Sequence, residues 1–243
     1  MISVAIVGCG YWGPNMARVF SQTGSSRLHT CCDLKEENLE KMKAIYPYVN
    51  VTRDFNSVIN NPEIHAVVIA VPTRFHYPLA KQALLAGKHV LVEKPMTETS
   101  EQGRDLNEVA KAQGKILMVD HTFEYHQGIR KVKEIIDSGE LGEIYYIKAN
   151  WLNLGLLQPD VNVVFDLATH IFSIINYLTG SKPESLKAVG KAYVRDEIEE
   201  VANVVLFYPN KVLAKVNVSW LEPCKQRNMT IVGSKKMLVF DLL

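Results

Sequence analysis

Short apolar segments alternate with amphipathic segments through the first half of the chain. Five apolar runs are continuous enough for strands buried on both faces of a sheet: residues 3–8, 27–33, 65–72, 88–95 and 115–120. Helical patterns lie between most of them: residues 14–24, 35–46, 75–87 and 100–114. Ser100 is placed to cap the last helix. The alternation predicts an α/β domain over residues 1–120, with a doubly wound parallel sheet.

The pattern changes near residue 121. After helices expected near 127–138 and 166–180, short strand-like runs follow one another with turn residues between them and no further helix. One strand-like run, residues 142–154, lies between the two helices. The others follow the second helix and are residues 185–194, 201–209, 211–221, 228–233 and 236–243. Closely spaced strands are typical of antiparallel pairing. We therefore predict a second domain over residues 121–243, an α+β domain with a largely antiparallel sheet.

Composition narrows the classes of function. Lysine and arginine number 27 against 26 acidic residues, a net charge of +1, so nothing favours a nucleic-acid or acidic-membrane partner. No apolar run approaches the roughly 18 residues of a membrane span, and the N-terminus is predicted to be a strand and not a signal peptide. The four cysteines form no C-x-x-C pair. We expect no disulfide framework and a cytoplasmic protein.

Three glycines at G-x-G-x-x-G spacing, Gly8, Gly10 and Gly13, follow the first strand and open the first helix. At this place glycines permit a tight turn, a close backbone approach by a pyrophosphate, and helix–strand packing. Asp33 ends the second strand, where a carboxylate would bind the adenosine ribose. The alternative is a glycine turn that binds no nucleotide. Asp33 favours NAD over NADP because it would repel a 2′-phosphate, although Lys35 nearby could soften that preference.

Two further patterns carry polar side chains suited to catalysis. Lys94 ends a predicted parallel strand, at the sheet edge where ligands bind in such folds. Asp166, His170, Ser173 and Tyr177 recur at steps of 4, 3 and 4, so a helix would place them on one face. From spacing alone the simpler interpretations are favoured: a solvated lysine, an aspartate that caps the helix, and a surface histidine.

Five features follow one another along the chain: the glycine motif GCGYWG, Asp33, AVPTRFH (70–76), EKP (93–95) and D-x-x-x-H (166–170). In this order they resemble the pattern of the glucose–fructose oxidoreductase/inositol dehydrogenase/MocA family. The resemblance covers essentially the whole chain and is strongest to dehydrogenases of sugars or nucleotide-linked sugars, such as the 3-dehydrogenases of UDP-linked N-acetylhexosaminuronic acids. It implies hydride transfer between a secondary hydroxyl and the nicotinamide of NAD, with NADP possible. The alternatives are an inositol or polyol dehydrogenase, a ketoreductase, or a cofactor-binding fragment without catalysis.

The resemblance also implies roles for individual residues. Lys94 would contact the reacting hydroxyl, and Asp166 would bind substrate or orient the histidine. Either Lys94 or His170 could remove the proton; we expect His170 to be the general acid/base, a role that suits imidazole, with Lys94 as its electrostatic partner. The residues implied in cofactor binding are Gly8, Gly10, Tyr11, Trp12, Gly13, Asp33, Pro72, Thr73, His76, Glu93 and Lys94. Those implied in substrate binding are His121, Tyr125, Trp151, Asp166 and His170. No cluster has metal-ligand spacing, so we expect no metal.

The chain departs from the family pattern in four places. One is EYHQGIRK (124–131), which replaces a more usual Y-N-P-A-V pattern. Trp151 stands where relatives usually carry arginine, and Ile171 follows His170 where they often carry aspartate. A lost arginine could shift the preference for an anionic substrate. The chain also ends at Leu243, earlier than the resemblance leads us to expect, as if truncated at the C-terminus. Its open second sheet is expected to mediate homo-oligomerisation.

Overall fold

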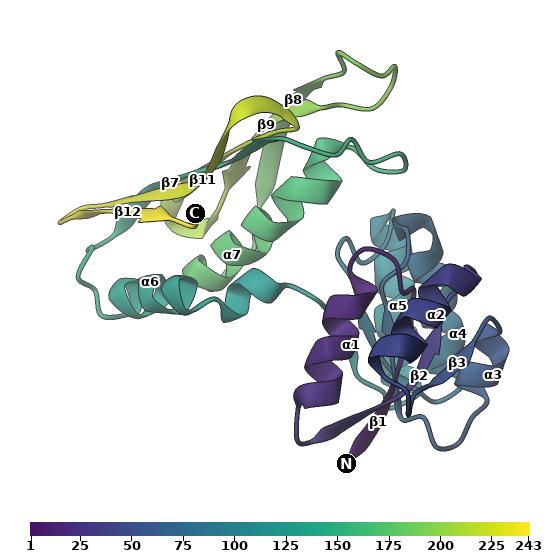
Figure 1. Ribbon diagram of the computed structural model, residues 1–243. Coiled ribbons are helices and arrows are strands. Elements are labelled where there is room, and N and C mark those ends of the chain that lie inside the picture. Colours follow the sequence, from purple (N-terminus) through teal and green to yellow (C-terminus); the bar gives the residue numbers. More distant parts are fainter. The chain divides into compact units, whose positions relative to one another are not determined.

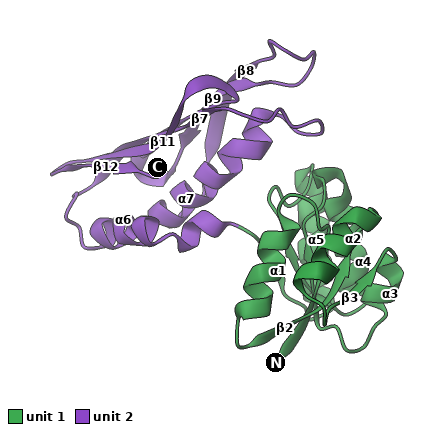
Figure 2. Ribbon diagram, in the orientation of Figure 1, with its two compact units in different colours: residues 1–120 green, residues 121–243 purple.

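The computed structural model describes all of residues 1–243. The chain forms two compact units, Met1–Asp120 and His121–Leu243 (Figure 2). Each unit is built around its own six-stranded sheet. None of the helices combines the length and the apolar character that crossing a membrane requires.

The first unit contains a parallel sheet with the order β3-β2-β1-β4-β5-β6. Its strands are β1 (Ile2–Val7), β2 (Ser26–Cys32), β3 (Asn50–Thr52), β4 (Ala66–Ile69), β5 (His89–Val92) and β6 (Leu117–Val119). Every strand pair is parallel. The predicted doubly wound sheet is confirmed, and the carboxyl ends of all six strands meet at one edge.

Helices cover both faces of this sheet (Figure 1). They are α1 (Gly13–Gln22), α2 (Glu36–Ile45), α3 (Phe55–Ile59), α4 (His76–Leu85) and α5 (Ser100–Ala112). Helices α1 and α2 contribute to one buried cluster, and α3, α4 and α5 contribute to another. Neighbouring residues of β1 alternate between the two clusters, as a strand covered on both faces requires.

Helix α5 is capped one residue earlier than the sequence predicts. Thr99, and not Ser100, is the N-cap, and its hydroxyl accepts a hydrogen bond from the backbone N–H of Gln102 at 3.3 Å. Ser100 already has helical backbone and donates its hydroxyl to Glu101 at 3.0 Å. Either residue type caps a helix well, so the local pattern alone could not separate them.

The second unit contains a mixed sheet with the order β12-β11-β7-β10-β9-β8. Its strands are β7 (Ile144–Leu154), β8 (Ser185–Lys191), β9 (Val201–Phe207), β10 (Leu213–Ser219), β11 (Leu221–Gly233) and β12 (Met237–Asp241). Only the central pair β7 and β10 is parallel. The prediction of a largely antiparallel sheet is therefore confirmed.

Helices α6 (Gln127–Asp137) and α7 (Thr169–Thr179) lie on the same side of this sheet (Figure 1). A π-helical turn, Val164–Ala168, leads directly into α7. The apolar residues of both helices and the inward residues of the strands form one core. On the other side of the sheet Lys148, Asn203 and Lys215 are exposed. The expected homo-oligomerisation through this sheet stays a prediction.

Candidate active-site residues in the two units

The glycine loop between β1 and α1 is shaped by two close backbone approaches. Gly8 has a φ of 91°, and a Cβ there would lie 2.4 Å from the carbonyl oxygen of Ala70. A Cβ on Gly13 would lie 1.9 Å from the carbonyl oxygen of Gly8. By contrast, a Cβ on Gly10 would meet no heavy atom within 4 Å. The fold itself therefore requires glycine at two positions and leaves open space at the third.

Asp33 is bound to this loop. Its carboxylate accepts a hydrogen bond from the backbone N–H of Cys9 at 2.6 Å and another from the backbone N–H of Lys35 at 2.8 Å. The carboxylate thus lies beside the loop that opens α1, directly after β2. Tyr11, which is 95% exposed, and Trp12 also belong to the loop.

The segment after β4 carries Pro72, Thr73 and His76, which begin a 3₁₀ turn and α4. Thr73 and His76 are buried. The ring nitrogens of His76 lie 2.8 Å from the carbonyl oxygens of Val71 and Pro95. This histidine therefore connects the loops that follow β4 and β5. We therefore expect His76 to affect cofactor binding by holding these two loops in position.

The ends of β5 and β6 bring two carboxyl groups together. Glu93 and Asp120 directly follow Val92 and Val119, which pair in the sheet. Glu93 Oε1 and Asp120 Oδ2 are buried, and neither accepts a hydrogen bond from a donor group. Burial, followed by interaction with the Asp120 carboxyl, raises the pKa of Glu93 to about 8. Glu93 therefore holds a proton at neutral pH beside Lys94, whose backbone N–H donates to Glu93 Oε2 at 3.2 Å.

The raised pKa of Glu93 makes stability depend on pH. The pKa of Glu93 is raised from 4.5 to about 8 by folding, so the folded chain holds the proton more tightly. The contribution to stability is complete below pH 4.5 and is lost as the pH rises through about 8. We expect Glu93→Gln to remove a slope of up to about 1.4 kcal/mol per pH unit in this range. Urea unfolding at several pH values measures it, with the exposed Glu98→Gln as control. Identical slopes in wild type and Glu93→Gln would contradict the raised pKa of Glu93.

In the second unit Trp151, His170 and Phe123 form an aromatic cluster. The rings of Trp151 and His170 stack at 5.8 Å between centroids with an interplanar angle of 23°. Phe123 meets both rings edge-on, at 4.8 Å from Trp151 and 5.0 Å from His170. Trp151 is buried, whereas His170 is half-buried. The cluster therefore fixes the plane of the imidazole.

Asp166 is held by a different aromatic residue. The indole N–H of Trp220 donates to its carboxylate at 3.0 Å. Asp166 lies within the π-helical turn, and Asn162 accepts the backbone N–H of Phe165 near the start of that turn. Asp166 is therefore not the residue that caps this helix. The shared face predicted for Asp166, His170 and Tyr177 crosses a π-to-α junction.

Two other predicted substrate residues lie at the two ends of the 3₁₀ turn Thr122–Tyr125. His121 precedes this turn and is half-buried. Tyr125 ends it, is 57% exposed, and has the guanidinium carbon of Arg130 at 5.2 Å from its ring centroid. Their part in substrate binding stays a prediction.

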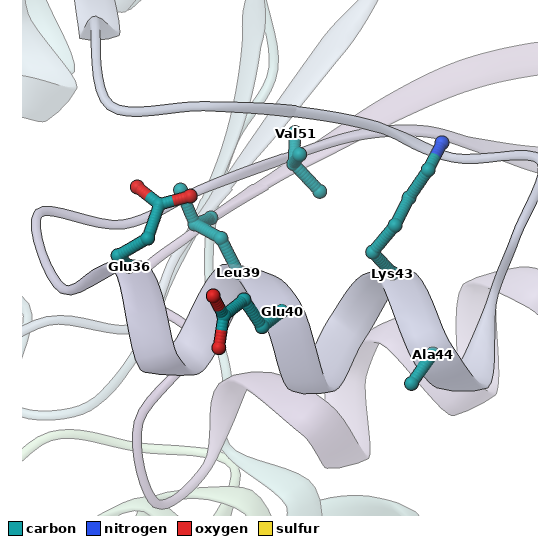
Figure 3. A pocket seen from close by; sticks show the side chains of 6 residues that line it. All are labelled: Glu36, Leu39, Glu40, Lys43, Ala44 and Val51. Carbon is teal, nitrogen blue, oxygen red and sulfur yellow. The ribbon is translucent and has the colours of Figure 1, made fainter.

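A hollow on the first unit lies elsewhere, on α2 and β3 (Figure 3). Its lining residues are Glu36, Leu39, Glu40, Lys43, Ala44 and Val51. None of these is a predicted site residue, so we assign it no role. In neither unit do three or more His, Cys, Asp or Glu side chains gather closely enough to hold a metal ion.

Two family models together match most of the chain. Residues 2–121 match the oxidoreductase family with the NAD-binding Rossmann fold, and residues 129–239 match the Gfo/Idh/MocA C-terminal domain. The chain belongs to the Gfo/Idh/MocA oxidoreductase family. Its N-terminal unit is the NAD-binding domain of that family, as the glycine motif and Asp33 predict.

Characterised relatives within the Gfo/Idh/MocA family act on different substrates. The chain is 31% identical over 227 residues to the 1-carboxy-3-chloro-3,4-dihydroxycyclohexa-1,5-diene dehydrogenase of Comamonas testosteroni, covering 89% of this chain and 57% of that protein. It is 27% identical over 196 residues to scyllo-inositol 2-dehydrogenase (NADP(+)) IolW of Bacillus subtilis, covering 74% and 52%. The chain thus spans little more than half the length of these two relatives.

Solved structures share the fold. GenD2 from gentamicin A biosynthesis, in complex with NAD, superposes with a TM-score of 0.93 at 22% identity, over 99% of this chain and 72% of that one. The WlbA dehydrogenase of Bordetella pertussis, in complex with NADH and UDP-GlcNAcA, gives 0.91 at 24% identity, over 98% and 73%. At these identities the similarity supports the Gfo/Idh/MocA architecture of both units.

Proposed function

We propose that the chain is an NAD-dependent dehydrogenase that oxidises a secondary hydroxyl of a sugar, a nucleotide-linked sugar or a polyol. The observation that carries the proposal is the Asp33 carboxylate bound 2.6 Å from the glycine-loop amide of Cys9. Such a carboxylate suits the ribose hydroxyls of a dinucleotide. The open space at Gly10 fits a pyrophosphate that approaches the backbone there.

The remaining chemistry is assigned to three side chains. Oxidation of an alcohol requires a base for the O–H proton, and His170 supplies an imidazole whose plane is fixed by Trp151 and Phe123. The Lys94 ammonium stabilises the developing alkoxide. Asp166, oriented by the Trp220 indole, binds a substrate hydroxyl. NAD, when bound, supplies the hydride acceptor.

Cofactor preference is tested at Asp33. We expect NADH to raise the melting midpoint of the wild type more than NADPH does, because only bound ligand stabilises the fold and the carboxylate repels a 2′-phosphate. Asp33→Asn keeps an oxygen that can accept the hydrogen bond from Cys9. It should lower the ratio of the NADPH dissociation constant to the NADH dissociation constant about tenfold, a change of roughly 1.4 kcal/mol in relative binding free energy. The exposed Glu40→Gln is the control. A wild type that favours NADPH, or an unchanged ratio in Asp33→Asn, would contradict the assignment.

Two alternatives stay open to direct assay. A ketoreductase would oxidise NADH with a keto sugar faster than it reduces NAD with the alcohol. A cofactor-binding protein without catalysis would give the NADH-dependent shift of the midpoint and no turnover with any sugar or polyol. The His170 ring lies against Trp151 and the Asp166 carboxylate accepts from Trp220, so each side chain is held in one orientation, which favours catalysis over the second alternative.

A further inference from the structure

Arg227 on β11 lies directly opposite Trp151 on β7 in the register of the sheet. Opposed residues share one face, so Arg227 lies on the side of the sheet that α7 covers. Its guanidinium carbon is 4.9 Å from the centroid of the Trp151 ring. Trp151 is therefore the shared neighbour of Arg227 and of the His170 imidazole.

The charge of Arg227 has no counter-ion within the chain. Its guanidinium forms no ion pair and no hydrogen bond, and its Nε is buried. Burial also lowers the pKa of Arg227. A partly desolvated cation costs free energy unless it is compensated, and contact with one aromatic face compensates only part of it.

Arg195 in the same unit is a tryptophan-bound arginine whose charge has an acidic partner. It also lies over a tryptophan, with its guanidinium carbon 5.6 Å from the Trp220 ring centroid. However, Arg195 lies 3.7 Å from the fully buried carboxylate of Glu200 and donates to the carbonyl oxygen of Gln158. The unit therefore provides an acidic partner for one tryptophan-bound arginine and none for the other.

We propose that Arg227 binds an anionic substituent, a carboxylate or a phosphate, of the substrate whose hydroxyl reacts at His170. The inference rests on the proposed function and narrows its substrate class to acidic sugars or polyols. A guanidinium presents a planar fork of donors that matches either group, and its Nη atoms have no competing partner in the chain.

The test is equilibrium binding to the NADH-loaded protein, measured by calorimetry. The probes are D-glucuronate and D-glucose 6-phosphate, with D-glucose as their neutral counterpart. We expect the wild type to bind at least one anionic probe about 10- to 100-fold more tightly than D-glucose, as a charged hydrogen bond implies. Arg227→Met should abolish that preference while leaving the affinities for D-glucose and NADH unchanged. Arg227→Lys should restore part of it. The exposed Lys182→Met removes the same charge elsewhere in the unit and should keep the preference.

Each arm has a distinct meaning. A preference for glucuronate alone indicates a carboxylate partner, and a preference for the 6-phosphate alone indicates a phosphate. Absence of any preference in the wild type, or a preference that survives Arg227→Met, overturns the proposal. Equal loss of D-glucose and anion binding in Arg227→Met would make Arg227 a packing residue and overturn it too. NAD reduction is assayed separately, so a protein that binds anions through Arg227 without turnover would refute the proposed function and not the anion site.

Discussion

Replacing His170 by alanine is expected to lower kcat by roughly 10²- to 10⁴-fold, the usual contribution of a positioned general base. The imidazole is stacked on Trp151 and touched edge-on by Phe123, so its orientation is set before substrate binds. The NADH dissociation constant should not change, because the glycine loop and Asp33 belong to the other unit. Steady-state kinetics on the best substrate of a sugar and polyol panel, with NADH titration alongside, measure both quantities.

Packing must be separated from chemistry in this experiment. Alanine leaves a space beside Trp151 and Phe123, and the loss of contacts could itself reduce activity. His170→Gln fills more of that space and still cannot act as a base, so it should be as inactive as His170→Ala while melting closer to the wild type. Tyr177→Phe removes a hydroxyl farther along the same helix and should stay active. Turnover retained in His170→Gln would assign the proton transfer to another group.

The first unit follows closely from local patterns. Continuous apolar runs such as residues 65–72 can be buried on both faces only when helices cover both faces of the sheet. That arrangement is typical of parallel sheets, and the sheet of the first unit is parallel. The glycine spacing and Asp33 also lie as predicted, because strand, turn and helix are consecutive in sequence. The short elements β3 and α3 were not predicted. They span 3 and 5 residues, too few for a hydrophobic period to be recognised.

The contacts that shape the candidate site in the second unit depend on distant segments. Trp220 reaches Asp166 across 54 residues, and Arg227 reaches Trp151 only because β11 pairs with β7 in one register. No local spacing encodes that register, so neither contact could be predicted. Asp120 carried a usable signal, since it ends an apolar run as Asp33 does. The π-helical turn at Asp166 gave no signal that helical periodicity could detect.

Two glycines of one loop should give opposite results when each is replaced by alanine. In Gly13→Ala the new Cβ would lie 1.9 Å from the backbone oxygen of Gly8, and no rotamer change can relieve a clash with backbone. We expect a loss of roughly 3 kcal/mol or more in the free energy of unfolding, a size seen when strain enters a packed core. In Gly10→Ala the Cβ meets nothing within 4 Å, and φ is not positive. That variant should be as stable as the wild type, or slightly more stable because its unfolded chain has less freedom.

Cofactor binding then separates the structural glycine from the functional one. Although Gly10→Ala folds normally, its methyl group would occupy the space that we assign to the pyrophosphate, so NADH should bind at least about tenfold more weakly. Gly24→Ala, also with no heavy atom within 4 Å of its Cβ, lies outside the loop and should bind NADH like the wild type. Thermal melts with and without NADH measure stability and binding in one experiment. Normal NADH binding by a stable Gly10→Ala would refute the placement of the phosphates at this loop. A stable Gly13→Ala would instead show that the loop can move away from α1, a freedom that its close backbone contacts argue against.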